Sequence, residues 1–357
     1  MSKARQNANI SPAVGRNMVI NGAMNLAQRS ASVTGLGTTD GYFTVDRFAL
    51  AGGNTAGRLT MSQTADGPNG ISANCLKLDC TTADTSIAAS EFLHIQQRFE
   101  GQNLQRIGKG VVGAKQITLS FYVKANAAFT FGCELFDNDN TRQITKLYNT
   151  TTDWVRHEIT FPADVDDGSS PFDDDKSVSL YLLFWLHAGS NFTSGTLNTA
   201  SWANVTNANR AAGIDSFFSS TDNSFFITGV QMEVGPVATD FEQEEISTTL
   251  SKCQRYFQLY PEETAVTGSC YNSDPDWYFP FVFPEMRAAP TVTFSDNPLL
   301  FCNNDNSDTT SVTSNSNIDN IKSIRLQAQS AAVGSAGQAG WLQMNAANSY
   351  FTLDAEL

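Results

Sequence analysis

The sequence predicts an all-β protein built from stacked antiparallel sheets, and three observations indicate this class. Several segments alternate apolar and polar residues with a period of two, the pattern of a half-buried strand. Phe, which strands favour, occurs 24 times in 357 residues. Clusters of Gly, Asn, Asp and Ser separate the alternating segments, as turn residues do. Many short strands between such turns are typical of a β-sandwich or jelly roll.

The clearest strands lie in the first two thirds of the chain. The segment 92–99 carries apolar side chains and Gln97 on one face. Its more polar face carries Phe92, His94, Gln96 and Arg98. The segments 117–124, 155–161 and 228–234 alternate in the same way. The segment 178–186 is almost continuously apolar, which predicts a strand covered on both faces.

One helix is predicted, over residues 242–261. Ile246, Leu250, Cys253 and Phe257 recur at spacings of four, three and four, so they would share one helix face. Acidic residues early and basic residues late in this segment complement the helix dipole. Two interpretations stay open: a helix packed on its own domain, or a seam near a symmetry axis between subunits.

The remaining segments predict a smaller β domain. The prolines of 277–284 cannot donate to a central ladder, so this segment is expected at a sheet edge. The polar segment 303–320 is expected to be a surface loop. The expected organisation is a basic arm over 1–16, a jelly roll over 17–241, a linking helix over 242–261 and a C-terminal β domain over 262–357.

Charge restricts the partners. With 36 acidic and 22 basic residues the formal net charge is −14, which disfavours nucleic acid and anionic membranes. No apolar run is long enough to insert into a membrane. The leader is basic, with Lys3, Arg5 and Arg16, and has no acidic residue before Asp40. It is either an arm that docks on an acidic partner or an ordinary frayed terminus.

The six cysteines include no closely spaced pair of the C-x-x-C type. Cys75 and Cys80 fall in one expected strand, too far apart for a disulfide. Together with the absence of a visible signal peptide, this predicts folding in a reducing cytoplasm.

Residues for catalysis are hard to find. The three histidines belong to no recognised catalytic motif, and no glycine-rich loop joins a strand to a helix. Pairs of carboxylates suited to glycoside hydrolysis arise by chance among 36 acids. The sequence therefore predicts a protein that is not an enzyme.

Two kinds of binding residue can still be named. The acidic loop with Asp164, Asp166 and Asp167 is either solvated or holds a structural Ca²⁺, the one cofactor that the sequence suggests. Aromatic rings in or near loops either pack internally or stack on sugars. These aromatic residues are Tyr148, Trp154, Phe192 and Trp202.

Five phrases resemble a family of tailed-bacteriophage tail-fibre and related virion structural proteins. They are NMVINGAMNLAQR at 17–29, YFTVDRF at 42–48, QQRFEGQNL at 96–104, ITGVQMEVG at 227–235 and FPEMRAAPT at 283–291. Their order along the chain is more specific than any single phrase.

The resemblance implies a jelly roll similar to carbohydrate-binding modules, followed by a smaller β domain, in a homotrimeric fibre. It implies a place on the virion, contact with other tail or adaptor proteins, and attachment to a glycan of the host surface. The alternatives are a purely structural decoration or tail-assembly protein and, less favoured, a polysaccharide depolymerase.

Overall fold

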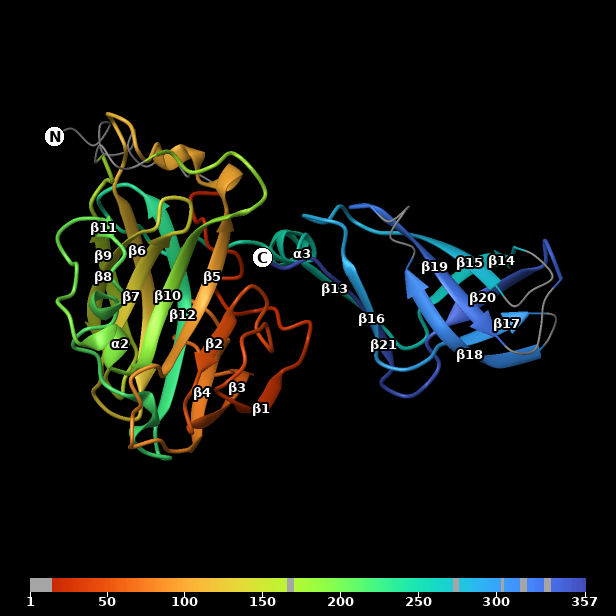
Figure 1. Cartoon of the computed structure of the whole chain (residues 1–357), viewed down its shortest axis with the longest axis horizontal. Helices are drawn as coiled ribbons and strands as arrows, with labels where there is room; N and C mark the ends of the chain where they lie inside the picture. Colours follow the sequence, from red (N-terminus) through yellow and green to blue (C-terminus); the bar gives the residue numbers. More distant parts are fainter. Residues whose placement is uncertain (1–14, 166–169, 272–275, 303–304, 315–319, 331–334) are drawn as a thin grey trace. The chain divides into compact units, whose positions relative to one another are not determined.

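The computed structural model describes residues 15–165, 170–271, 276–302, 305–314, 320–330 and 335–357 (Figure 1). Strands dominate this part of the chain, which confirms the predicted all-β class. The chain forms two compact units: the first runs to Thr249 and includes Leu357, and the second is Leu250–Glu356. No helix among the described residues has the length and apolar character needed to cross a bilayer.

The first unit is a jelly-roll sandwich of two antiparallel six-stranded sheets. The first sheet has the order β1-β3-β4-β12-β6-β9, and the second has the order β11-β8-β7-β10-β5-β2. The first sheet contains β1 Ser32–Leu36, β3 Arg58–Thr64, β4 Cys75–Thr82, β12 Ser224–Val234, β6 Ile117–Ala125 and β9 Val155–Phe161. The second contains β11 Ala203–Asn204, β8 Arg142–Asn149, β7 Thr130–Asp137, β10 Val178–Ala188, β5 Phe92–Glu100 and β2 Ala49–Gly53. Short helical turns interrupt the loops: η1 Gly101–Asn103, η2 Gln105–Ile107, α2 Ser190–Thr193, η3 Asn207–Asn209 and η4 Phe217–Ser219.

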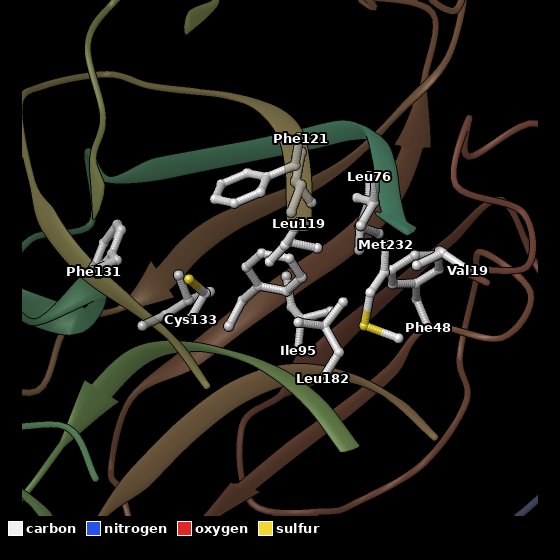
Figure 2. Packing of buried hydrophobic residues seen from close by; sticks show 14 of the residues in the cluster. Val19, Phe48, Leu76, Ile95, Leu119, Phe121, Phe131, Cys133, Leu182 and Met232 are labelled. Carbon is white, nitrogen blue, oxygen red and sulfur yellow. The ribbon is translucent and has the colours of Figure 1, made fainter. Parts of the chain in front are cut away.

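The core of this unit lies between the two sheets. Ile95 and Leu182 from the second sheet meet Leu119 and Phe121 from the first, as Figure 2 shows. The apolar residues of the alternating segments are therefore the ones that lie in the core. β10 is paired along both edges, by β5 and β7. Its outward Leu183 and Trp185 are buried but its outward Tyr181 is half-buried, so the prediction that both faces are covered is confirmed only in part.

Two of the five family-like phrases contact each other across the fold. The amide of Met18 donates to the carbonyl of Met232, and the amide of Val230 donates to the carbonyl of Gly22. The carboxamide of Asn17 accepts from the amide of Met232. A Cβ at position 22 would lie 2.1 Å from the carbonyl oxygen of Val230, so only glycine fits. These contacts hold the start of the unit against β12.

The end of the basic leader is attached to an acidic segment of the same unit. The amides of Gly15 and Asn17 donate to the carboxylate of Glu242, at 2.6 and 2.8 Å. Arg16 donates from Nη2 to the carbonyl of Asp240 at 2.7 Å. Lys3 and Arg5 lie outside the described residues, so docking of the arm on a partner stays a prediction.

The linking helix is shorter than predicted. α3 covers only Ile246–Gln254, and the chain then forms the strand β13, Phe257–Pro261, which pairs with β21. The proposed seam is wrong as a continuous helical stripe, because Phe257 is a strand residue. Along the helix itself, Ile246 is 53% exposed, Leu250 is half-buried and Cys253 is 1% exposed. Pairing with a strand near the end of the chain overrides the local helical spacing.

The second unit contains a closed six-stranded barrel and a three-stranded sheet, β13-β21-β16. The barrel strands are β14 Ala265–Cys270, β15 Asp276–Val282, β19 Ser323–Ser330, β18 Asp305–Ser314, β17 Leu299–Cys302 and β20 Ala339–Gln343. The sheet adds β16 Thr291–Phe294 and β21 Tyr350–Asp354. Trp277, Phe279 and Leu326 lie in the core of this unit.

Two predictions for this unit are corrected. The segment expected as an edge strand is β15, which pairs with β19 along its length and with β14 at Trp277 and Tyr278 only. Pro280 therefore lies beyond the β14 ladder, which is why a proline is tolerated there. Residues 305–314, expected in a loop, form β18, because pairing with β17 and β19 outweighs their polar composition.

Candidate functional site

A cleft of about 370 Å³ opens on the outer face of the second sheet of the jelly roll. Its walls combine aromatic rings with amide, carboxylate and guanidinium groups. The lining residues are Asp40, Ala51, Phe92, His94, Gln96, Arg98, Phe136, Tyr181, Leu183, Trp185, Phe192, Asn207 and Arg210.

The strand register brings these side chains together. Outward residues of β5 and β10 face each other in pairs, with Trp185 opposite His94 and Tyr181 opposite Arg98. On the other side of β10, Tyr181 is opposite Phe136 of β7. Because alternate residues point to one face, each strand places its side chains in the cleft at every second position.

Aromatic rings form the floor and the rim. The ring of His94 lies 4.9 Å from that of Trp185 and 5.6 Å from that of Phe92, centroid to centroid. Phe192, in α2, lies 5.4 Å from Trp185 and 5.8 Å from Phe92. Trp185 is 1% exposed, whereas Phe92, Tyr181 and Phe192 are half-buried and offer ring surface to a ligand.

A charge pair holds this floor in place. Arg210 donates from Nε and Nη2 to the two oxygens of Glu134, at 2.9 and 3.0 Å. The indole Nε1 of Trp185 donates to the same carboxylate at 2.7 Å. The guanidinium lies 4.9 Å from the ring centroid of Phe136 and 5.2 Å from that of Trp185. Since Glu134 is fully buried, the network fixes both the indole and the guanidinium.

Polar groups for a ligand lie at the other end of β5. The guanidinium of Arg98 is 5.6 Å from the ring centroid of Tyr181. With the amide of Gln96 oriented so that its oxygen faces Arg98, that oxygen accepts from Nη2 at 2.8 Å. Nη1 of Arg98 donates to the carbonyl of Leu357. The cleft therefore combines apolar ring faces with amide and guanidinium donors.

His94 is neutral at physiological pH. Burial, followed by the positive charges of Arg210 and Arg98, lowers the pKa of His94 to about 3. Its Nδ1 is buried and has no hydrogen-bond partner among the described residues. Protonating this ring would place a third positive charge in the cleft.

The low pKa of His94 predicts that acid destabilises the protein. Between about pH 6.5 and pH 3 the unfolded chain binds a proton that the folded chain does not, so this contribution to stability is lost as the pH falls. The slope approaches about 1.4 kcal/mol per pH unit. Urea unfolding from pH 4 to 8 measures it. The wild type should lose more stability on acidification than His94→Gln; parallel curves would contradict the assignment.

Comparison with that variant is needed because the other two histidines act in the same direction. Burial also lowers the pKa of His157 and of His187. Both residues are present in the wild type and in the variant, so their contributions cancel in the difference.

The four aromatic residues named from the sequence have different fates. Phe192 lines the cleft. Trp154 is half-buried immediately before β9, a strand of the other sheet, and its Nε1 donates to the carbonyl of Asp66 at 3.1 Å. Tyr148 and Trp202 are buried in the core, at 3% and 6% exposure, and cannot offer a ring face to a ligand. The prediction that Tyr148 and Trp202 contact a sugar is therefore wrong.

Asp164 is buried in a cluster of charges. Arg142 donates to its two oxygens at 2.8 and 2.9 Å, and Nζ of Lys109 lies 3.6 Å away. Lys109 also pairs with the buried Asp137 at 2.6 Å. Within the described ranges no three His, Cys, Asp or Glu side chains gather as a metal site. Asp166 and Asp167 lie outside those ranges, so a structural Ca²⁺ stays a proposal.

The alternation in the sequence predicts the side chains of one wall of the cleft but not those of the others. The polar face of Phe92, His94, Gln96 and Arg98 lies in the cleft as a unit. Tyr181, Phe136 and Arg210 were not singled out. The available signal was the second face of the strand at 178–186, where aromatic residues alternate beside the inward leucines.

Neither a scan against protein-family models nor a search of curated proteins finds a match. Among solved structures, the enzymatically active domain of tailspike protein 4 of bacteriophage CBA120 is 10% identical, with a TM-score of 0.32. That match covers 61% of this chain and only 21% of the tailspike chain.

Two carbohydrate-binding modules are similar to the same degree. The family 11 module of the Clostridium thermocellum cellulase Lic26A-Cel5E is 12% identical, with a TM-score of 0.29, and the match covers 59% of this chain and 99% of the module. The module TmCBM61, solved with β-1,4-galactotriose, is 11% identical, with a TM-score of 0.29, covering 62% and 99%. At these scores, the likenesses do not assign a function to this chain.

Proposed function

We propose that this chain binds a glycan in the cleft on the outer face of β5, β7 and β10. The observation that carries the proposal is the combination of half-buried rings with fixed polar groups. A sugar ring has an apolar C–H face and a polar edge of hydroxyl groups. Phe92 and Tyr181 offer surface for the first, while Asn207 and Arg98 offer hydrogen-bonding groups for the second.

The biological setting is a further part of the proposal. We infer a tailed-phage tail fibre or receptor-binding virion subunit, a homotrimer held to tail or adaptor proteins and attached to a host-surface glycan. The support is the resemblance of the five phrases together with the all-β, two-unit architecture. A purely structural virion protein is the alternative, and it leaves the aromatic cleft without a role.

We also propose that binding occurs without catalysis. Among the described residues, Asp40 is the one carboxylate in the lining, and its Oδ1 accepts from the amide of Gly52 at 3.0 Å. Glu134 lies beneath the lining and is held by Arg210 and Trp185. Retaining and inverting glycosidases both need two carboxyl groups beside the scissile bond, so the cleft is better suited to recognition.

A second polar group resembles a catalytic relay and is better explained as structural. His187 lies 2.7 Å from Oγ of Ser216 and 3.1 Å from a carboxylate oxygen of Glu91. The imidazole is fully buried, Phe218 packs edge-on against it at 5.3 Å, and none of the three lines the cleft. Ser216 itself is half-buried, but the imidazole and Glu91 beside it are buried and lie outside the cleft, so we propose that this group stabilises the fold.

Removing one ring from the rim of the cleft should weaken glycan binding. We expect Tyr181→Ala to bind about tenfold more weakly, equal to about 1.4 kcal/mol, because one stacking surface is lost. The measurement is binding to an array of bacterial O-antigen and capsular polysaccharides, followed by titration of the best glycan.

The matched control is Trp154→Ala, which removes a half-buried ring beside the other sheet, immediately before β9, and should leave affinity unchanged. Circular dichroism would establish that both variants are folded. Absence of binding to every glycan, or equal loss in both variants, would rule out the cleft as the binding site.

A further inference from the structure

One face of the C-terminal barrel carries exposed aromatic rings on an uncharged surface. The strands β14, β20 and β17 are neighbours in the barrel, and none of them contains Asp, Glu, Lys, Arg or His. For a chain with a net charge of −14, three adjacent strands without a charge are notable. Alternation turns Val266, Leu300 and Leu342 into the barrel core and leaves their neighbours on the outside.

Trp341 is the centre of this face. It is 44% exposed, whereas Trp185, Trp202 and Trp277 are all buried. Its ring lies 5.2 Å from that of Phe301 with an angle of 8° between the planes. The strand register places Trp341 opposite Phe301 on one side and opposite the exposed Thr267 on the other. Two nearly parallel rings therefore lie beside a hydroxyl group.

A second pair of rings lies on the other side of β14. Ser269 is opposite Tyr278 of β15. The ring of Tyr278 lies 5.4 Å from that of Tyr271, which is 71% exposed. The guanidinium of Arg325 covers Tyr278 at 4.5 Å from the ring centroid. The hydroxyl-bearing strand β14 thus runs between two aromatic pairs.

We propose that this barrel face, formed by the outward side chains of β14, β17 and β20 with Tyr271 and Tyr278, is a second sugar-binding surface that takes an uncharged glycan. The rings match the C–H faces of sugars, and Thr267, Ser269 and Gln343 supply neutral hydrogen-bonding groups. The strands β14, β17 and β20 offer no charge to a ligand, and the Arg325 guanidinium lies over Tyr278 at one edge of the surface.

A second copy of the chain fits this face less well. The centres of subunit interfaces are depleted of Ser and Ala. Here the strand between the aromatic pairs carries Ala265, Thr267 and Ser269 outward. Hydroxyl groups between separated rings suit a ligand that is itself a row of hydroxyl groups.

Calorimetric titration of the full chain tests this proposal. The probes are soluble neutral polysaccharides: dextran, mannan, galactan and a β-1,3-glucan. We expect that Tyr181→Ala, with its cleft impaired, still binds one of them, and that Trp341→Ala added to it abolishes this binding. Because Trp341 is the most exposed of the tryptophans named above, the probe should also protect the fluorescence of the wild type from acrylamide quenching.

The matched control is Tyr350→Ala, which removes a 38% exposed ring from β21, outside the barrel. Binding abolished by Tyr181→Ala alone would overturn the second surface and leave the cleft proposal intact. Binding that survives both Tyr181→Ala and Trp341→Ala, or no binding of these neutral probes to the wild type, would overturn the second surface, whereas the cleft is tested separately on the bacterial polysaccharides. A lower oligomer mass in Trp341→Ala would overturn this proposal and assign the face to contact between copies.

Discussion

Replacing Asp164 by Ala should destabilise the jelly-roll unit by about 3–5 kcal/mol, because it removes one carboxylate from a buried group of charges. The side chains of Asp164, Arg142 and Lys109 are 3%, 4% and 1% exposed, so water cannot take over the role of the carboxylate. Both oxygens of Asp164 are engaged by Arg142, which makes the geometry difficult to replace.

Urea unfolding followed by circular dichroism measures this loss. The control is Asp79→Ala, which breaks a solvent-exposed pair with Lys77 at 2.8 Å and should change stability by less than about 0.5 kcal/mol. Equal effects of the two substitutions would show that the buried cluster contributes no more than a surface pair.

The same experiment tests the calcium hypothesis. If Arg142 and Lys109 neutralise Asp164, the unfolding midpoint of the wild type should be the same in EGTA as in CaCl₂. A midpoint that falls in EGTA for the wild type, but not for Asp164→Ala, would indicate that Ca²⁺ binds with this carboxylate as a ligand.

The strands could be predicted because, in a β-sandwich, buried and exposed residues alternate along each strand. On β5 the apolar Leu93, Ile95 and Phe99 face the core at every second position, and the intervening residues form the cleft wall. A period of two needs no knowledge of the partner strand.

Which face of a strand is the core is a different matter. On β8, Tyr148 points inward and is 3% exposed, whereas the adjacent Leu147 points outward and is 40% exposed. From polarity alone, Leu147 would be expected to be buried and Tyr148 to be exposed. Tyr148 packs against Phe121 of β6 and Phe184 of β10. Because these neighbours are distant in sequence, the local pattern could not predict that Tyr148 is buried.

The helix predicted over residues 242–261 is longer than α3 for a related reason. The spacing from Ile246 to Phe257 fits a helix face, but Phe257–Pro261 pairs with β21, which lies at the end of the chain. Aromatic residues also favour strands, so this segment was locally ambiguous. Pairing with the distant strand β21 makes this segment a strand.

The floor of the cleft depends on a contact between residues far apart in sequence. Glu134 and Arg210 are 76 positions apart, and nothing near either one predicts the other. Replacing Glu134 by Gln should destabilise the unit by about 2–4 kcal/mol, since a buried carboxylate that neutralises a guanidinium becomes a neutral amide. Arg210 is 16% exposed, so water compensates in part and the lower half of this range is expected.

The loss should extend to glycan binding, because Glu134 also orients the indole of Trp185. A double-mutant cycle with Arg210→Gln separates the two effects. Removing both charges should cost less stability than the sum of the single changes, with a coupling energy of about 1–3 kcal/mol, but should not restore the shape of the cleft or its affinity.

The matched control for this cycle is Glu158→Gln, which breaks an exposed pair with Arg156 at 2.6 Å in the other sheet and should have little effect. Additive single changes would show that Glu134 and Arg210 act independently. Full affinity in Glu134→Gln would show that the cleft binds its ligand without a fixed floor, and the rims formed by Phe92 and Tyr181 would then carry the recognition alone.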